Sequence, residues 1–508
     1  MDKRTIGGRI TDMINPIAVK EMRQAVKSRL IIWVLMLFLL IQLVVIIVVL
    51  VFSKEFDDFN AGPGVFMTIL SILLGTCLLF IPAITALRLA SERSDSNLDL
   101  LFITTLRPRH IMWGKLVAAV ILTLLFFSAC LPFMTLTYLF RGLDLPSMFI
   151  LLGLDFLVVV LSIQGSIMLA ACPGGLIARG IRFLFGLALL VAAFGYTIAI
   201  SGAMLFGGIG SSLTTWNFWG PALTIVACIF LLIGLLNVLS VALVSPPSSN
   251  KMIGVRIYTL FLWIASMVII AVWMSVIPRG RFLEEIIYSW SACAGIGACI
   301  LLFISICERQ EWGLRIRRTI PQNIFLRLPA FLLYTGAAGG VLLSVLIMAA
   351  SFLIGFFVVI ALGKDPDDEF VRMLPYSAFY FISYALTALL IKRIFFKRVT
   401  FFGLPIAIAL VLLIAGTAFP VIAAFLLKKG AWYDTSELWL ICNPFVMLAE
   451  YRTFWHEAML FSGIWCAVIS LIMLPWFVKQ FRSFKPLKIT KTEIEDTTDE
   501  RELSKVSA

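Results

Sequence analysis

The stretch Leu89-Ala-Ser-Glu-Arg-Ser-Asp-Ser-Asn-Leu-Asp-Leu-Leu-Phe-Ile-Thr-Thr-Leu-Arg-Pro-Arg-His-Ile-Met-Trp-Gly-Lys115 is a charged segment between two long apolar runs. Ser96 and Asp99 form a Ser-x-x-Asp capping pattern, in which both side chains satisfy backbone N–H groups of a first helical turn. Arg107 ends the helical pattern, because the residue before a proline is disfavoured in the α conformation. The inner part of the segment therefore predicts a helix of about ten residues, within residues 91–106, that is too short to cross a bilayer and is expected to lie at its surface.

The composition places this segment in a membrane protein. The chain has 508 residues, of which 61% are hydrophobic and only 14% are charged, against about 25% charged residues in soluble domains. Its nine cysteines contain no Cys-x-x-Cys pair, so we interpret them as packing residues rather than as a disulfide framework or a metal site. The fold expected is all-α, a polytopic membrane protein with about twelve spanning helices in two modules.

The apolar runs give the expected boundaries, since a spanning helix needs about 20 residues. The first six spans are expected at residues 30–52, 65–87, 111–140, 147–172, 183–206 and 221–244. The second six are expected at residues 257–276, 288–306, 330–362, 374–391, 402–427 and 458–478. A polar linker, 245–256, separates the modules 30–244 and 257–478, and the acidic tail 479–508 is expected to be disordered and cytoplasmic.

The basic residues predict the orientation. Most of the 41 Lys and Arg residues fall in segments that lie on one side of the membrane if the number of spans is even. Lys and Arg are enriched in cytoplasmic loops, so both termini are expected in the cytoplasm of a plasma (inner) membrane protein. The net charge of +12 is thereby explained by topology, and nucleic acid is not an expected partner.

The charged segment also resembles a known family. Ala90-Ser91-Glu92-Arg93, followed by Leu98-Asp99-Leu100-Leu101, Arg107-Pro108 and Gly114-Lys115, is similar to the cytoplasmic connection of permease subunits in type 2 ATP-binding cassette exporters. In that family the connection holds a coupling helix that rests in a groove of a separate ATPase subunit. The chain departs from the pattern at Ser96, where glycine is common, and at Thr105, where proline is common. The residues to which the resemblance assigns this coupling role are Glu92, Arg93, Leu98, Asp99, Leu101, Phe102 and Arg107.

The basic N-terminal segment, 1–29, predicts an interfacial helix. Asn15 is a favourable N-cap and Pro16 fits the first helical position, while Lys20 and Arg23 share a polar face. With Glu21, these residues also resemble the connecting helix that opens permeases of this family. The alternative interpretation is an ordinary basic flank that orients the first span.

The chemistry of an ATPase or another enzyme is not apparent in the sequence. It contains no phosphate-binding loop, and its only histidines, His110 and His456, are predicted on opposite sides of the membrane. If ATP drives this protein, ATP and Mg²⁺ bind to a partner ATPase, and this chain binds no cofactor or metal. We therefore expect a transporter membrane subunit rather than an enzyme, with membrane lipid around it.

Two further sets of residues are candidates within the spans. Asp155, with Gln164 farther along the same run, is a candidate for a transport path, since an intramembrane carboxylate is costly unless it is paired or faces water. The alternative is that Asp155 bonds a neighbouring helix near the outer interface. Trp216 and Trp219 are candidates for an outer gate by resemblance, or members of an interfacial aromatic belt.

The second module leaves the stoichiometry open. The connection 307–327 echoes the first one through Glu308-Arg309 and Pro321, but we favour a basic inner loop because the other positions do not align. The second module is then either accessory, with a homodimeric core, or a diverged second half of the core. The expected function is the permease subunit of an ATP-driven exporter of unknown substrate. The alternatives are an ATP-independent secondary carrier and a membrane scaffold or assembly factor without transport.

Overall fold

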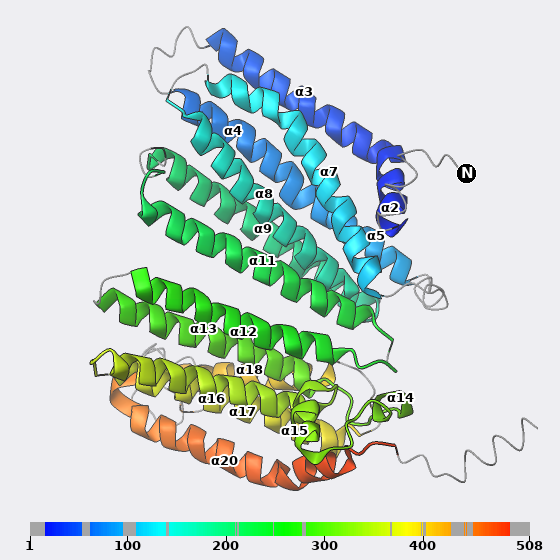
Figure 1. Ribbon diagram of the computed structural model, residues 1–508, viewed down its shortest axis with the longest axis vertical. Helices are drawn as coiled ribbons and strands as arrows, with labels where there is room; N and C mark the ends of the chain where they lie inside the picture. The colour runs from blue at the N-terminus through cyan, green and yellow to red at the C-terminus, as the bar shows by residue number, and fades with distance from the viewer. Residues whose placement is uncertain are drawn as a thin grey trace, which may run out of the picture. The chain divides into compact units, whose positions relative to one another are not determined.

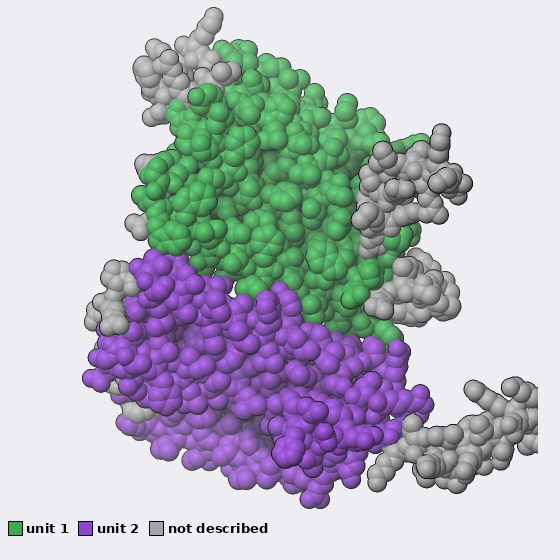
Figure 2. Space-filling model, in the orientation of Figure 1, with its two compact units in different colours: residues 1–246 green, residues 247–508 purple. Residues whose placement is uncertain are grey.

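The computed structural model is helical throughout its described part and divides into two compact units, residues 1–246 and 247–508 (Figure 1, Figure 2). The described residues are 16–52, 61–94, 108–138, 142–208, 210, 213–246, 248–276, 281–365, 368–397, 399, 403–427, 441, 443 and 451–487. The tail after residue 487 and the inner part of the charged segment, 95–107, lie outside them.

Unit 1 is a helix bundle preceded by one short helix, α2 (Pro16–Lys27). Its spanning helices are α3 (Arg29–Phe52), the continuous run α4 (Ala61–Gly75), η1 (Thr76–Phe80) and α5 (Ile81–Ser94), then α7 (Pro108–Thr137), α8 (Leu145–Ala171), α9 (Leu176–Phe206) and α11 (Trp216–Val244). The π-helical turn η1 ends at Phe80, two residues before Pro82. Proline has no N–H to give to the preceding turn, and a widened turn absorbs that missing bond without ending the helix.

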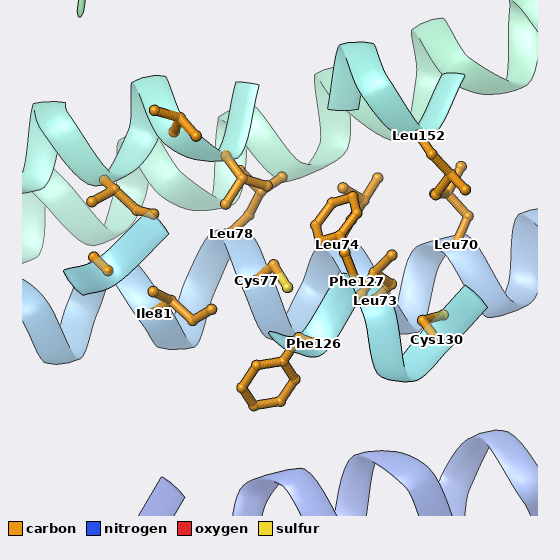
Figure 3. Packing of buried hydrophobic residues seen from close by; sticks show 14 of the residues in the cluster. Leu70, Leu73, Leu74, Cys77, Leu78, Ile81, Phe126, Phe127, Cys130 and Leu152 are labelled. Atoms are coloured by element: carbon orange, nitrogen blue, oxygen red, sulfur yellow. The ribbon is translucent and has the colours of Figure 1, made fainter. Parts of the chain in front are cut away.

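The core of unit 1 forms around this second span. Leu73, Leu74 and Cys77 are fully buried and meet Phe126 and Phe127 of α7 (Figure 3). In water, burying apolar surface stabilises a fold by about 25 cal/mol for each Å². Within lipid that term is absent, and these contacts stabilise the bundle through close packing. The charged segment therefore follows α5, the end of the most buried span of unit 1, and precedes α7.

Unit 2 contains a second set of long helices with two short helices between its second and third spans. The long helices are α12 (Met252–Val276), α13 (Arg281–Ile306), α16 (Ala337–Ala361), α17 (Asp368–Phe395), α18 (Leu404–Leu427) and α20 (Tyr451–Ser483). The short helices are α14 (Leu314–Arg317) and α15 (Ile324–Leu333). In the described part of the chain, eleven helices are long and apolar enough to cross a membrane, and α18 contributes a shorter apolar stretch, Leu404–Pro420.

The run predicted as one span at 330–362 is broken in the structure. Helix α15 ends at Leu333, and α16 begins at Ala337. Arg256 binds the carbonyl of Leu332 in the last turn of α15 and those of Tyr334 and Gly336 in the break. In the sequence, Gly336, Gly339 and Gly340 indicate a bend or a tight helix contact in this long run; Gly336 lies in the break, and Gly339 and Gly340 pack closely against their neighbours.

Candidate functional site

The short helix α2 packs against the start of α7 and the start of α3. Ala18, Glu21 and Ala25 form its buried face, whereas Lys20 and Arg23 are exposed. Small residues on the inner face allow a close approach to α7, and long basic residues remain on the outer face, as in an interfacial helix. Figure 1 shows α2 beside the ends of α5 and α7. We call this region the α2 end of unit 1.

Gly114 permits the contact between α2 and α7. A Cβ atom on Gly114 would lie 2.9 Å from the Cβ of Ile17 and 3.1 Å from the backbone nitrogen of Ala18. Such distances are shorter than ordinary van der Waals contact, so a larger residue would push the two helices apart. The glycine of the Gly114-Lys115 pair therefore has a packing role.

Lys115 joins three elements by ion pairs at the α2 end. Its Nζ atom lies 2.6 Å from Oε1 of Glu21 in α2 and 2.8 Å from Oε2 of Glu92 in α5. The Lys115 side chain is 4% exposed, Glu21 is 9% exposed and Glu92 is 30% exposed. Two carboxylates share one ammonium group, so the cluster carries an excess negative charge, and Glu92 is the member that water reaches. A displacement of Glu92 therefore acts on α2 through Lys115, which both carboxylates share.

The other predicted coupling residues flank this cluster in the sequence. Arg93 lies in the last turn of α5, and its side chain is outside the described residues. Leu98, Asp99, Leu101, Phe102 and Arg107 lie wholly outside the described residues, as does Asn15. The described part of the structure therefore places both ends of the segment at the Lys115 cluster, and the predicted helix at 91–106 stays a prediction beyond Ser94.

Asp155 and Gln164 lie on the buried side of α8. The hydroxyl of Ser201 in α9 donates to Oδ1 of Asp155 at 2.9 Å, and Gln164 Nε2 donates to Ser240 Oγ in α11 at 3.2 Å. Among the described residues, Oδ2 of Asp155 and Oε1 of Gln164 have no hydrogen-bond partner. Asp155 lies about 15 Å along α8 from Leu145, at 1.5 Å per residue. Both expected roles for Asp155 remain predictions.

Trp216 and Trp219 lie in the first turns of α11, which begins at Trp216 rather than at the predicted Pro221. The Nε1 atom of Trp219 donates to the carbonyl of Leu213 at 2.8 Å, and its ring packs edge-on against Phe218 at 5.4 Å. Both tryptophans are substantially exposed. The position at a helix end fits the belt and the gate interpretations equally.

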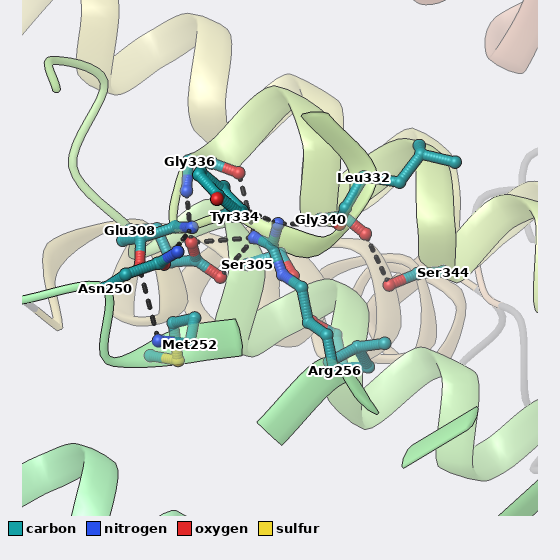
Figure 4. A network of polar contacts seen from close by, with 12 residues as sticks. Asn250, Met252, Arg256, Ser305, Glu308, Leu332, Tyr334, Gly336, Gly340 and Ser344 are labelled. Carbon is teal, nitrogen blue, oxygen red and sulfur yellow. Dashed lines mark hydrogen bonds and ion pairs between the residues drawn. The ribbon is translucent and has the colours of Figure 1, made fainter. Parts of the chain in front are cut away.

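A second charged cluster, in unit 2, was not predicted as a site. Arg256 of α12 is fully buried and donates from Nη2 to both carboxylate oxygens of Glu308, at 2.6 and 2.7 Å (Figure 4). It also donates to the carbonyls of Leu332, Tyr334 and Gly336. The N–H of Gly336 in turn donates to Oε2 of Glu308 at 2.6 Å. Burying a charge is costly unless it is paired and bonded, and this pair receives most of its bonds from the end of α15 and the turn before α16, while Nε of Arg256 has no partner among the described residues.

The turn is also bonded to the chain before α12 and covered by aromatic rings. Oδ1 of Asn250 accepts from the N–H and hydroxyl of Thr335, at 2.9 and 2.8 Å, and Trp312 Nε1 donates to the Thr335 carbonyl at 2.6 Å. Phe484, which follows α20, packs against Trp312 at 5.1 Å and Phe331 at 5.5 Å. We call this region the α15 end of unit 2. Arg256, at the end of the predicted linker 245–256, lies in the second turn of α12, and an arginine directly before an apolar run was the signal from which the cluster could have been found.

The fold and these two clusters define an all-α, multi-pass membrane protein whose two units each carry a buried ion pair at one end of the bundle. No family model matches this chain, and no curated protein or solved structure matches it either. In the described residues, no group of three or more His, Cys, Asp or Glu side chains is arranged to hold a metal ion. The structure therefore establishes an all-α, multi-pass membrane protein.

Proposed function

We propose that this chain is the permease subunit of an ATP-binding cassette exporter in the plasma (inner) membrane, driven by a separate ATPase subunit. The observation that carries the proposal is the Lys115 cluster, which ties α2, α5 and α7 together at both ends of segment 95–107. The resemblance assigns the coupling role to that segment. ATP and Mg²⁺ would bind the partner, and both termini and the α2 end would lie in the cytoplasm.

The cluster gives a physical route for coupling. A force applied to segment 95–107 acts on α5 and α7, which leave and enter the best-packed part of unit 1. Because Glu21 shares Lys115 with Glu92, α2 responds to the same movement. Coupling requires that the ATP-bound partner bind one arrangement of these helices more tightly than the other. The carboxylate of Glu92, which is 30% exposed, is the group at which that difference is most easily produced.

The test is affinity capture of the tagged full-length chain from native membranes in mild detergent, with ATPase activity measured in the eluate. Wild type is compared with the double charge reversal Glu92→Lys and Asp99→Lys. The matched control is Glu311→Lys, a charge reversal at an exposed position of the α15 end. We expect a separate ATPase with the wild type and control, and at least about tenfold less with the double variant, or about 1.4 kcal/mol of binding. Absence of an ATPase from all three, even after cross-linking in membranes, would refute the proposal.

A secondary carrier is the second candidate, because Asp155 is buried with one carboxylate oxygen unpartnered among the described residues. A carboxyl group near the middle of a membrane is a usual place for proton or cation coupling. In proteoliposomes that contain no ATPase, such a carrier would dissipate an imposed pH gradient, and Asp155→Asn would stop it. A gradient that persists with the wild-type chain would argue against the carrier.

A further inference from the structure

The two units share a packing order that the sequence does not reveal. In unit 1 the fourth spanning helix, α8, packs against the second, fifth and sixth, which are α5, α9 and α11. In unit 2 the fourth spanning helix, α17, packs against the second, fifth and sixth, which are α13, α18 and α20. Contacts between consecutive antiparallel helices are expected in any bundle. Contacts of the fourth helix with the second and the sixth are not expected in every bundle, so their presence in both units indicates a common packing arrangement.

The short helices occupy equivalent places in this order. Helix α2 packs against the first and third spanning helices of unit 1, α3 and α7. Helix α15 packs against the first and third spanning helices of unit 2, α12 and α16. The two short helices come from different places in the chain, since α2 precedes the first span of its unit and α15 precedes the third. This difference in chain position is why no second connecting helix was found in the sequence.

The close contacts of the short helices are also alike. Gly114, in the second turn of α7, leaves no room for a side chain against Ile17 and Ala18 of α2. Gly339, in the first turn of α16, leaves no room against the carbonyl of Phe331 in α15. In each unit a glycine near the start of the third spanning helix thus admits the backbone of the short helix.

The buried charges correspond in part. Glu92 lies in the last turn of the second spanning helix of unit 1, and Glu308 lies two residues after the second spanning helix of unit 2. Each pairs with a buried base, but the bases lie on different helices: Lys115 is in α7, the third spanning helix of unit 1, and Arg256 is in α12, the first spanning helix of unit 2. The echo between Glu92-Arg93 and Glu308-Arg309 therefore corresponds to an acidic residue at the end of the second spanning helix of each unit.

We infer that unit 2 is a second copy of the six-span half formed by unit 1, with α15 in the place of α2, and that one chain supplies both halves of the membrane core. Some transporters built from parallel repeats have six spans in each repeat in the same way. The inference rests on the proposed function in one respect, the requirement of an exporter for two six-span halves. It replaces the homodimer by a single chain.

The test is a copy count on full-length protein. Two versions of the chain with different affinity tags are co-expressed, cross-linked in native membranes, captured through the first tag and probed for the second. The captured particle is also weighed by native mass spectrometry in lipid nanodiscs. We expect one copy per particle and no second tag above the level of a membrane protein of unrelated fold. Recovery of the second tag in comparable amount, with the mass of two chains, would overturn the inference.

The ATPase content of the same particles separates this inference from the proposed function. One chain per particle with an ATPase present agrees with both. One chain per particle without an ATPase keeps the two-half architecture and counts against the exporter assignment. Two chains per particle with an ATPase keeps the exporter assignment and refutes the single-chain core, so that unit 2 would be accessory.

Discussion

The α2 end of unit 1 and the α15 end of unit 2 use the same parts but hold them differently. At the α2 end one lysine serves two carboxylates, and Glu92 is 30% exposed. At the α15 end the Arg256 and Glu308 side chains are 0% and 1% exposed, and three backbone carbonyls accept from the Nη atoms of Arg256, whose Nε has no partner among the described residues. At the α2 end, Glu92 can separate from Lys115 at a small cost in free energy, because water reaches its carboxylate. At the α15 end, separating Arg256 from Glu308 leaves a buried charge unpaired. The comparison indicates a movable end in unit 1 and a fixed end in unit 2.

The largest expected effect is at the fixed end. Arg256→Met leaves Glu308 buried without its partner, and we expect a loss of about 3–5 kcal/mol in the free energy of unfolding of unit 2. The measurement is the thermal stability of the purified chain, followed by size-exclusion chromatography. Because an uncharged pair avoids the unpaired charge, the double variant Arg256→Met with Glu308→Leu should recover most of that loss. A double variant as unstable as the single one would contradict the argument.

At the movable end, the steric contact should matter next. Gly114→Leu places a side chain against Ile17 and should cost about 1–3 kcal/mol through displacement of α2. The measurement is the rate of proteolysis within residues 16–29, which should rise, together with thermal stability. Gly153→Leu is the matched control, since a Cβ on Gly153 meets no atom within 4 Å. Equal effects of the two substitutions would show that α2 is not held by this contact.

Removal of the shared cation should be milder than the loss of Arg256. Lys115→Met leaves Glu21 and Glu92 without their cation, but these carboxylates are 9% and 30% exposed, against 1% for Glu308, so we expect a smaller loss of about 1–3 kcal/mol. The same variant should reduce ATPase capture, because α2 and α5 are no longer linked. Lys115→Arg retains the charge and should restore capture. A destabilisation by Lys115→Met as large as that by Arg256→Met would remove the distinction between the two ends.

The smallest expected effect is a change in thiol reactivity beside the fixed end. Burial raises the pKa of Cys307 to about 11, from a reference value of 9.0, so little thiolate is present near pH 7 and alkylation is slow. Asn250→Ala removes the acceptor for Thr335 and should loosen the turn by about 1 kcal/mol. Increased solvation then lowers the pKa of Cys307 toward its reference value. Labelling of the Cys307 peptide, quantified by mass spectrometry, should rise about fivefold.

That labelling experiment has its own control and a clear contrary result. The rate for the wild-type chain should increase steadily as the pH is raised toward 11, because only the thiolate reacts. In Asn250→Ala the same increase should occur at lower pH. A wild-type Cys307 that is labelled near pH 7 as fast as the variant would mean that the α15 end already opens readily, and that the two ends do not differ in mobility.

Much of the fold could be predicted from composition and apolar run length, because lipid requires every backbone polar group to be bonded within its own segment. The all-α, multi-pass class is confirmed, with α3 at Arg29–Phe52 close to the predicted 30–52. The helix at Pro16–Lys27 was also predictable, from a proline at its first position and a polar face. These features depend on local sequence alone.

The parts that only the tertiary structure decided are those that join distant residues. The sequence drew attention to Lys115 and Glu21, but only folding brings them together across 94 positions. Arg256 and Glu308 are 52 positions apart, and neither lies in a recognisable motif with the other. The break between α15 and α16 followed the same rule, because its glycines indicated a bend or a tight contact, whereas the arginine that binds its carbonyls lies on another helix. Local pattern fixes where helices form in a membrane, whereas partners for buried charges are chosen by packing, which no single stretch of sequence contains.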